Sequence, residues 1–255
     1  MIARTAAVIE PGGVLGELAC APPLTLRQVY SDAPDRCELR LVGTAAGPLA
    51  GDDLSLSLQL RAGARVTLRA TGASLSQGRG RGRGWGHENL GDDAESAVLS
   101  IRADLAEGAD LVADPGALVV CAGSRVNVRL ELALDRGASV EWRELIVLGR
   151  TGEPPGQATL SWDVTRLGRP VLRQFVDLDL GSDLAKTGWA GLTSRRRVLA
   201  CALICDPAGT PRTMVASATA VAQRVDDHTL LVTVLDDDAA RATRQLDDLC
   251  ARARA

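Results

Sequence analysis

Two glutamates, Glu144 and Glu153, occur in sequence contexts that suggest a chemical role for their carboxylates. Glu144 falls on the apolar phase of the alternating run 140–148, so the pattern points its side chain into the core. A carboxylate on a core face is costly unless it is paired or hydrated. An arginine partner or a β-bulge would relieve that cost, and the functional alternative is a polar, water-filled passage. Glu153, in the Gly/Pro-rich stretch 149–156, is a second candidate, with a solvated turn as its simpler interpretation.

The sequence Asp226-Asp227-His228 could ligate a metal ion, because carboxylate and imidazole are acceptable ligands. Together with Glu153 it would define a metal-binding module or a hydrolase. A polar turn between two strands explains the same composition. Neither His228 nor the other histidine, His87, can be paired with a nucleophile from sequence.

Nucleotide and nucleic-acid binding have weak support. The chain has no G-x-x-x-x-G-K-[ST] motif, and the Gly/Arg loop 78–86 places glycines only at even positions, which excludes G-x-G-x-x-G there. That loop could bind RNA through stacked arginines. The net charge of −3 provides no basic domain around it, so we expect a surface loop and no nucleic-acid partner.

Alternating apolar residues dominate the chain and predict strands. Three segments combine such a run, a turn containing Gly-Ala at 63–64, 108–109 or 137–138, and a second run. Further runs occur at 160–164, 171–180, 198–205 and 229–235. We interpret the three segments as hairpins. The expected fold is all-β and mainly antiparallel, either sandwich-like or a helical stack of strands.

The end of the chain differs from the rest. Asp236, Asp237 or Asp238 could cap a helix. Its apolar residues follow three-and-four spacing: Ala239, Ala242, Leu246, Leu249, Cys250 and Ala253. With 255 residues and only 2% aromatics, the chain is expected to form a single domain, residues 1–255, around an aliphatic core.

Targeting signals are not evident. The six cysteines form no C-x-x-C pair, and the first residues lack a basic flank followed by an apolar stretch. The longest apolar run, 198–205, has less than half the roughly 18 residues that suggest a membrane span. We therefore expect a cytoplasmic protein with no membrane association.

Short motifs spread over residues 40 to 253 resemble one known family. Residues 44–52 (TAAGPLAGD) are similar to T-A-G-G-L-x-G-G-D, and residues 141–153 contain counterparts of W-x-E, L-G-R and G-E. The strand from Thr229 into the final helix resembles a closing L-G-D-x-A-E-x-V segment. This combination resembles the urease accessory protein family UreD, also called UreH. The chain departs from it at Ala46 and Ala50, and where the Gly/Arg loop replaces K-V-Y-R.

The resemblance implies a helical-shaped all-β domain with few helices and no enzymatic activity. It implies a chaperone scaffold for nickel insertion that binds UreF, which recruits the GTPase UreG, and that docks on apo-urease. An internal tunnel is the implied route for nickel. Asp52, matching G-G-D, Glu144 and Glu153 are then the expected oxygen ligands near the passage or an interface. Oxygen ligands would hold Ni²⁺ only transiently, and no tightly bound cofactor is expected.

Overall fold

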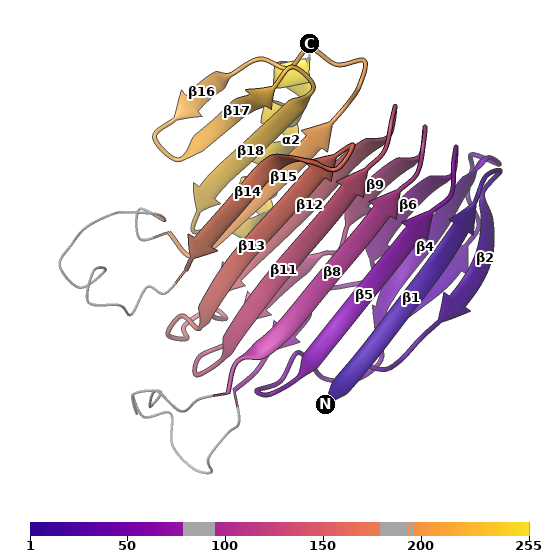
Figure 1. The fold of residues 1–255 in the computed structure, drawn as a ribbon. Coiled ribbons are helices and arrows are strands. Elements are labelled where there is room, and N and C mark those ends of the chain that lie inside the picture. Colours follow the sequence, from indigo (N-terminus) through magenta and orange to yellow (C-terminus); the bar gives the residue numbers. More distant parts are fainter. Residues whose placement is uncertain (79–94, 179–192, 194–195, 255) are drawn as a thin grey trace.

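Two β-sheets packed face to face make up most of the protein, and one end of the second sheet is covered by a helix (Figure 1). The structure is a computed structural model, and it describes residues 1–78, 95–178, 193 and 196–254. Sheet A contains β1 (Ile2–Glu10), β2 (Val14–Ala19), β5 (Asp53–Leu60), β8 (Ala97–Leu105), β11 (Arg125–Leu134), β13 (Gln157–Arg166) and β14 (Arg169–Asp177). Its spatial order is β14-β13-β11-β8-β5-β1-β2.

Sheet B has the order β16-β17-β18-β15-β12-β9-β6-β4-β3, with β10 beside β12 and β7 beside β10. Its strands are β3 (Leu24–Val29), β4 (Arg36–Gly43), β6 (Arg65–Ala70), β7 (Ser74–Ser76), β9 (Asp110–Asp114), β10 (Ala117–Val120), β12 (Ser139–Leu148), β15 (Val198–Cys205), β16 (Met214–Ser217), β17 (Ala220–Asp226) and β18 (Thr229–Asp236). The helix is α2 (Ala239–Arg254).

The chain alternates between the sheets, so the strands predicted as hairpin partners lie in opposite sheets. β5 is followed by β6, β8 by β9 and β11 by β12, each pair crossing from sheet A to sheet B. Within each sheet the successive strands pair in parallel, β5 with β8 and β8 with β11, and β6 with β9 and β9 with β12. The expected all-β fold is confirmed. The expected mainly antiparallel pairing is wrong, because alternation specifies the buried face of a strand and not its neighbour.

Three stacked turns make these crossings. Gly63, Gly108 and Gly137 have φ between +66° and +72°, a region that glycine enters without steric cost. In each turn the amide of the following alanine donates to the carbonyl three residues earlier, at 2.9–3.2 Å. The turns are also bonded to one another: the Gly63 amide donates to the Glu107 carbonyl and the Gly108 amide to the Arg136 carbonyl, both at 2.9 Å.

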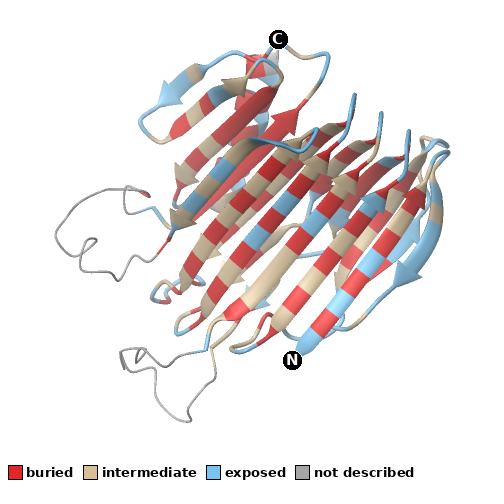
Figure 2. Cartoon of the chain, viewed as in Figure 1, coloured by how far each residue is buried: buried red, intermediate tan, exposed pale blue. Residues whose placement is uncertain are grey.

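The core is the aliphatic layer between the sheets. Figure 2 shows buried and more exposed positions alternating along the strands of sheet A. Apolar side chains from both sheets fill the layer, and Trp142 and Trp162 are fully buried in it. A second, smaller core lies between α2 and the outward faces of β15, β17 and β18. Strand β15 is therefore buried on both faces, which explains its continuous apolar sequence.

Helix α2 begins as the sequence predicts. The Asp238 carboxylate accepts the Arg241 backbone amide at 2.7 Å, which makes Asp238 the N-cap among the three candidates. Asp236 instead accepts the amides of Asp237 and Asp238 and the Arg241 guanidinium. No helix in the described part of the chain has the length and apolar character needed to cross a bilayer.

Candidate functional site

Glu144 lies inside the sandwich, at a break in sheet B. The first half of β12 pairs with β9 and the second half with β10, so residues 143–144 face the connection between those two strands. Gly116 in that connection passes so close to β6 that a Cβ would lie 2.8 Å from the Ala70 Cβ. On the other side, Glu144 is in register with Cys201 of β15. Glu144 is 6% exposed, which confirms its inward position.

Two features were expected to offset the cost of burying this carboxylate, an arginine partner or a β-bulge, and the described residues provide neither. The β12–β15 register runs without a shift from Val140 to Val147, so no bulge turns Glu144 outward. No arginine in the described residues pairs with it. The indole Nε1 of Trp142 donates to the Glu144 Oε2 at 3.3 Å. Among the described residues, the Trp142 indole is thus the hydrogen-bond partner of this carboxyl group.

Burial shifts the pKa values of Glu144 and of Cys201, the residue in register with it. Loss of solvation raises the pKa of Glu144 to about 7, with the Trp142 hydrogen bond opposing the shift and the Asp114 charge adding to it. Burial likewise raises the pKa of the Cys201 thiol to about 12, against a hydrogen bond with Thr233. Near neutral pH Cys201 is therefore a thiol, and both the neutral and the ionised form of Glu144 are populated.

Glu153 is held in the turn that follows β12. Its carboxylate accepts the Arg150 Nε at 2.7 Å and the Arg150 backbone amide at 3.1 Å. The Arg150 hydrogen bond lowers the pKa of Glu153, so this carboxylate is ionised. The Arg197 guanidinium donates to the Glu153 carbonyl oxygen. The residue is buried rather than solvated, and it closes the turn onto Arg197.

Asp52 holds the turn 44–52 together. Its Oδ2 accepts the Leu49 amide at 2.9 Å, and its Oδ1 accepts the α-amino group of Met1 at 2.7 Å. The Asp52 carbonyl accepts the Val98 amide at 2.7 Å, which ties the turn to β8. The side chain is buried and its hydrogen bonds stabilise the entry to β5.

Asp52 and Glu153 lie near one end of the sheets, whereas Glu144 lies deeper between them. The turns that hold Asp52 and Glu153 precede β5 and β13, which lie in the parallel part of sheet A, so both turns lie at one end of the sheets, here called the loop end. Glu144 precedes the last residue of β12, Leu148, by four positions, roughly 13 Å from that end at the usual rise. Within the described ranges, no three His, Cys, Asp or Glu side chains gather to hold a metal ion.

The Asp226-Asp227-His228 stretch forms the turn between β17 and β18. Asp226 pairs with Arg166 at 3.1 Å, and Asp227 pairs with Arg224. His228 Nδ1 lies 3.3 Å from the Gly209 carbonyl. Both carboxylates are thus matched by arginines, which supports the polar turn. His87 and, apart from Gly78, the Gly/Arg loop 78–86 lie outside the described residues.

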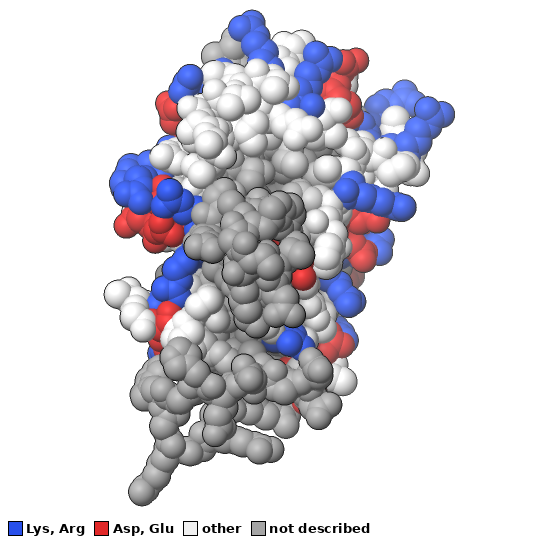
Figure 3. Space-filling model, turned by 90° about the vertical axis from the view of Figure 1, so that its left-hand side faces the viewer, with Lys and Arg blue, Asp and Glu red and all other residues white. Residues whose placement is uncertain are grey.

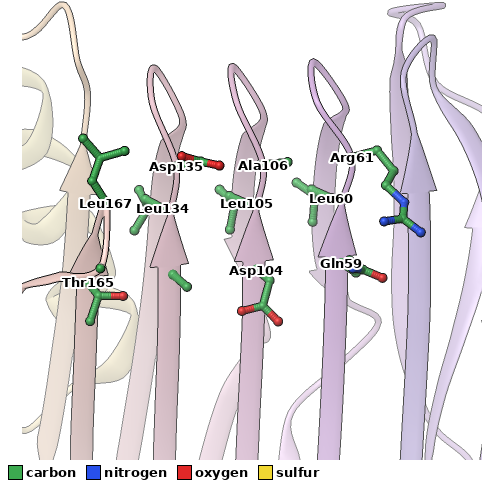
Figure 4. Close-up of a pocket in the computed structure, with 12 residues that line it drawn as sticks. Gln59, Leu60, Arg61, Asp104, Leu105, Ala106, Leu134, Asp135, Thr165 and Leu167 are labelled. Atoms are coloured by element: carbon green, nitrogen blue, oxygen red, sulfur yellow. The ribbon is translucent and has the colours of Figure 1, made fainter.

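A hollow of about 410 Å³ crosses the outer face of sheet A at the opposite end, beside the stacked turns (Figure 4). Arg61, Asp135 and Leu167 border it from the turns, and Asp104 and Thr165 from the strands. These side chains come from the ends of β5, β8, β11 and β13 that lie opposite the loop end. The hollow is therefore separate from the three carboxylates.

Sequence reasoning missed the partners of Glu144. Recognising Cys201 beside it requires the β12–β15 pairing, which no local pattern predicts. It also missed two buried polar atoms that have no hydrogen-bond partner among the residues the structure describes, Trp162 Nε1 and Gln174 Oε1, which lie on paired positions of β13 and β14. The Trp142–Glu144 spacing of two residues, on one face of a strand, was a usable signal for their hydrogen bond.

The structure thus defines a β scaffold in which Asp52, Glu144 and Glu153 are engaged by an amine and an amide, an indole, and an arginine. The chain matches the UreD urease accessory protein family over residues 6–255. It is 36% identical to urease accessory protein UreD 1 of Saccharopolyspora erythraea, over 76% of this chain and 73% of that protein. It is 29% identical to UreD of Streptomyces coelicolor, over 92% of this chain and 89% of that protein.

The chain therefore belongs to the UreD urease accessory protein family. The resemblance seen in its motifs is confirmed and extends to the N-terminal strands. Members of this family are accessory proteins of urease maturation and not catalytic enzymes, so the expectation of a non-enzyme agrees with the family.

Proposed function

We propose that this protein is a scaffold for nickel insertion into apo-urease, which bridges urease to its UreF and UreG partners and offers a passage for nickel. The observation that supports this most directly is Glu144, a buried carboxyl with a single indole partner at a break in sheet B. A buried ionisable group that serves no ion pair is more than the fold requires.

The chemistry of Glu144 suits transient contact with a divalent cation. With a pKa of about 7, the group can be neutral when no cation is near, which lowers the cost of its burial. A nickel ion would displace the proton and compensate the carboxylate charge. Since one oxygen ligand binds weakly, the ion would remain largely hydrated and could leave again.

The two other carboxylates would act earlier on this route. Asp52 and Glu153 belong to turns at the loop end, with Glu144 deeper in the sandwich. Asp52 is ion-paired with the Met1 α-amino group and Glu153 with Arg150, so a hydrated cation would contact these carboxylates only by competing with those partners. The free energy for directional transfer would come from the GTPase partner.

Replacement of Glu144 tests this passage. Glu144→Gln retains an acceptor for the Trp142 indole but removes the charge, and Glu144→Leu removes both. When either variant is co-expressed with the urease subunits and the other accessory proteins, we expect purified urease to contain several-fold less nickel per active site, measured by elemental analysis. Recovery of the accessory complex on an affinity resin should be unchanged.

The matched control is Glu131→Gln, an exposed glutamate on β11, which should leave the nickel content of urease unchanged. A wild-type nickel content with both Glu144 variants would remove this residue from the route. Loss of complex recovery would instead assign Glu144 to assembly.

A further inference from the structure

The outer face of sheet B is only partly covered by a helix. Helix α2 packs on the outward faces of β15, β17 and β18. The next strands across the sheet are β12, β10 and β7, and the described part of the chain contains no second helix that could cover them. The outward side chains of these three strands therefore determine what this part of the surface can bind.

Strand register identifies those side chains. The even-numbered residues of β12 are buried between the sheets, so Leu145 and Val147 point outward. On β10, Ala117 is in register with Leu145 and Val119 with Val147. Val119 is also in register with Leu75 of β7, which is 39% exposed. These five side chains are all apolar, and we call them the apolar strip.

The apolar strip is continuous with the core under α2. Leu145 is in register with Ala200 and Val147 with Val198, and both of these β15 residues are buried against α2. Leu145 and Val147 pack against the edge of the same core. Elsewhere acidic and basic side chains lie together on the surface, as on the face turned to the viewer in Figure 3. An exposed apolar patch of this kind is typical of an interaction site.

The flank of α2 beside the strip is lined by short side chains. Asp247 of α2 pairs with Arg143 of β12, so the side of the helix that carries Asp247 is turned towards β12. Ala240 and Thr243 precede Asp247 by seven and four residues and lie on that side as well. The Thr243 hydroxyl donates to the Ala239 carbonyl of its own helix at 2.9 Å. A second helix thus has room to approach α2 closely.

The dimensions of the strip fit one helix. The outer two of three neighbouring strands are roughly 10 Å apart, which is about the diameter of a helix with its side chains. Helices that pack side by side are about 8–10 Å apart, and α2 itself covers three strands. An extended segment fits less well, because on the face of a sheet its backbone groups would have no hydrogen-bond partners.

We infer that the apolar strip binds an amphipathic helix of a partner protein, which lies beside α2 and continues the helix layer on sheet B. Leu75 and Val119 would contact the apolar stripe of that helix, formed by side chains three and four residues apart. Removal of apolar surface from water would drive the association. Since no member of the strip is charged, binding should depend little on salt. This inference does not depend on nickel passage.

Binding of a labelled peptide tests it. The probe is a fluorescent helical peptide with leucines at positions i, i+3, i+4 and i+7 and glutamines on its other face, titrated with the full chain and read by fluorescence anisotropy. We expect Val119→Asp to weaken binding about tenfold or more, because the interface would bury its carboxylate. Leu75→Ala, which removes only exposed apolar surface, should weaken binding less. The affinity of the wild type should be nearly the same at low and high salt.

The matched control is Leu167→Asp, because Leu167 is an exposed leucine in the turn between β13 and β14, outside the strip. It should bind the peptide as the wild type does, and circular dichroism should show all variants folded. The inference is overturned if the peptide does not bind, if a peptide with the same residues in scrambled order binds equally, or if Leu167→Asp weakens binding as much as Val119→Asp. It is also overturned if the chain forms dimers that Val119→Asp dissociates, since the strip would then bind a second copy.

Discussion

Three buried carboxyl groups of this protein, those of Glu144, Glu153 and Asp236, differ in pKa because their neighbours differ. Glu144 lies among apolar side chains with one indole donor, and burial raises its pKa. Glu153 and Asp236 are also little exposed, but each accepts an arginine, and those hydrogen bonds lower their pKa values. The last two are therefore fixed anions that stabilise turns, whereas Glu144 can change its charge under physiological conditions.

This difference predicts a pH dependence of stability. Since the pKa of Glu144 is about 7 in the folded protein and near 4.5 when unfolded, the native state binds more protons between these values. The free energy of unfolding contributed by this group therefore falls as the pH rises from 4.5 to 7, by about 3 kcal/mol, and then stays constant. Glu144→Gln should abolish this contribution. The difference between the urea midpoint of the variant and that of the wild type should therefore increase as the pH rises from 4.5 to 7. Parallel midpoints across that range, as expected for Glu131→Gln, would contradict it.

At the level of elements, the stacked turns are the points where the chain must change sheets. Their glycines adopt a left-handed conformation, and their amides bond both within a turn and to the next turn. The conformation and hydrogen bonds of these turns thus help to direct the chain from one sheet to the other.

Gly108→Ala tests the conformational requirement alone, because a Cβ at that position would meet no atom within 4 Å. The positive φ of +66° should make this substitution cost about 1 kcal/mol of stability, seen as a lower melting temperature. Gly72→Ala is the control, since Gly72 also has open space but no positive φ. An equal shift for both variants would assign the effect to something other than the backbone.

The faces of the strands could be predicted from sequence, but their neighbours could not. The alternation at 54–60 and 140–148 correctly predicts buried leucines and an inward Glu144, because side chains of a strand point to opposite faces in turn. The same runs suit a hairpin and a crossing between sheets equally well. Short strands such as β7 and β10 carry too few residues to show a period. The register that places Glu144 opposite Cys201 depends on long-range strand pairing, which local sequence patterns do not specify.

On the scale of the whole molecule, two edge strands on one side of the protein, β14 and β16, expose large apolar side chains. Phe175 of β14 is 67% exposed and Val215 of β16 is 75% exposed. Both strands are edges of their sheets, and they lie on the same side in Figure 1. An edge strand with apolar side chains is prone to pair with another chain.

We therefore expect the protein to be poorly soluble when expressed alone and to be rescued by co-expression with its accessory partner. Phe175→Ser/Val215→Ser should reduce self-association of the isolated chain, measured by light scattering at matched concentration. Ile2→Ser, which removes an exposed apolar side chain from β1, an interior strand of sheet A, is the control and should leave self-association unchanged. Full solubility of the wild-type chain without a partner would be evidence against this expectation.

The strands β2 and β14 run antiparallel to β1 and β13, and so they terminate the parallel part of sheet A on both flanks. An uninterrupted parallel array could recruit further molecules indefinitely, as fibrils do. Reversal of the chain at each flank ends the parallel pairing, although β2 and β14 remain edges of the sheet. Pairs of successive strands such as β5–β6 and β8–β9 repeat one pairing scheme between these flanks, so such pairs could be inserted or deleted during evolution without altering either flank.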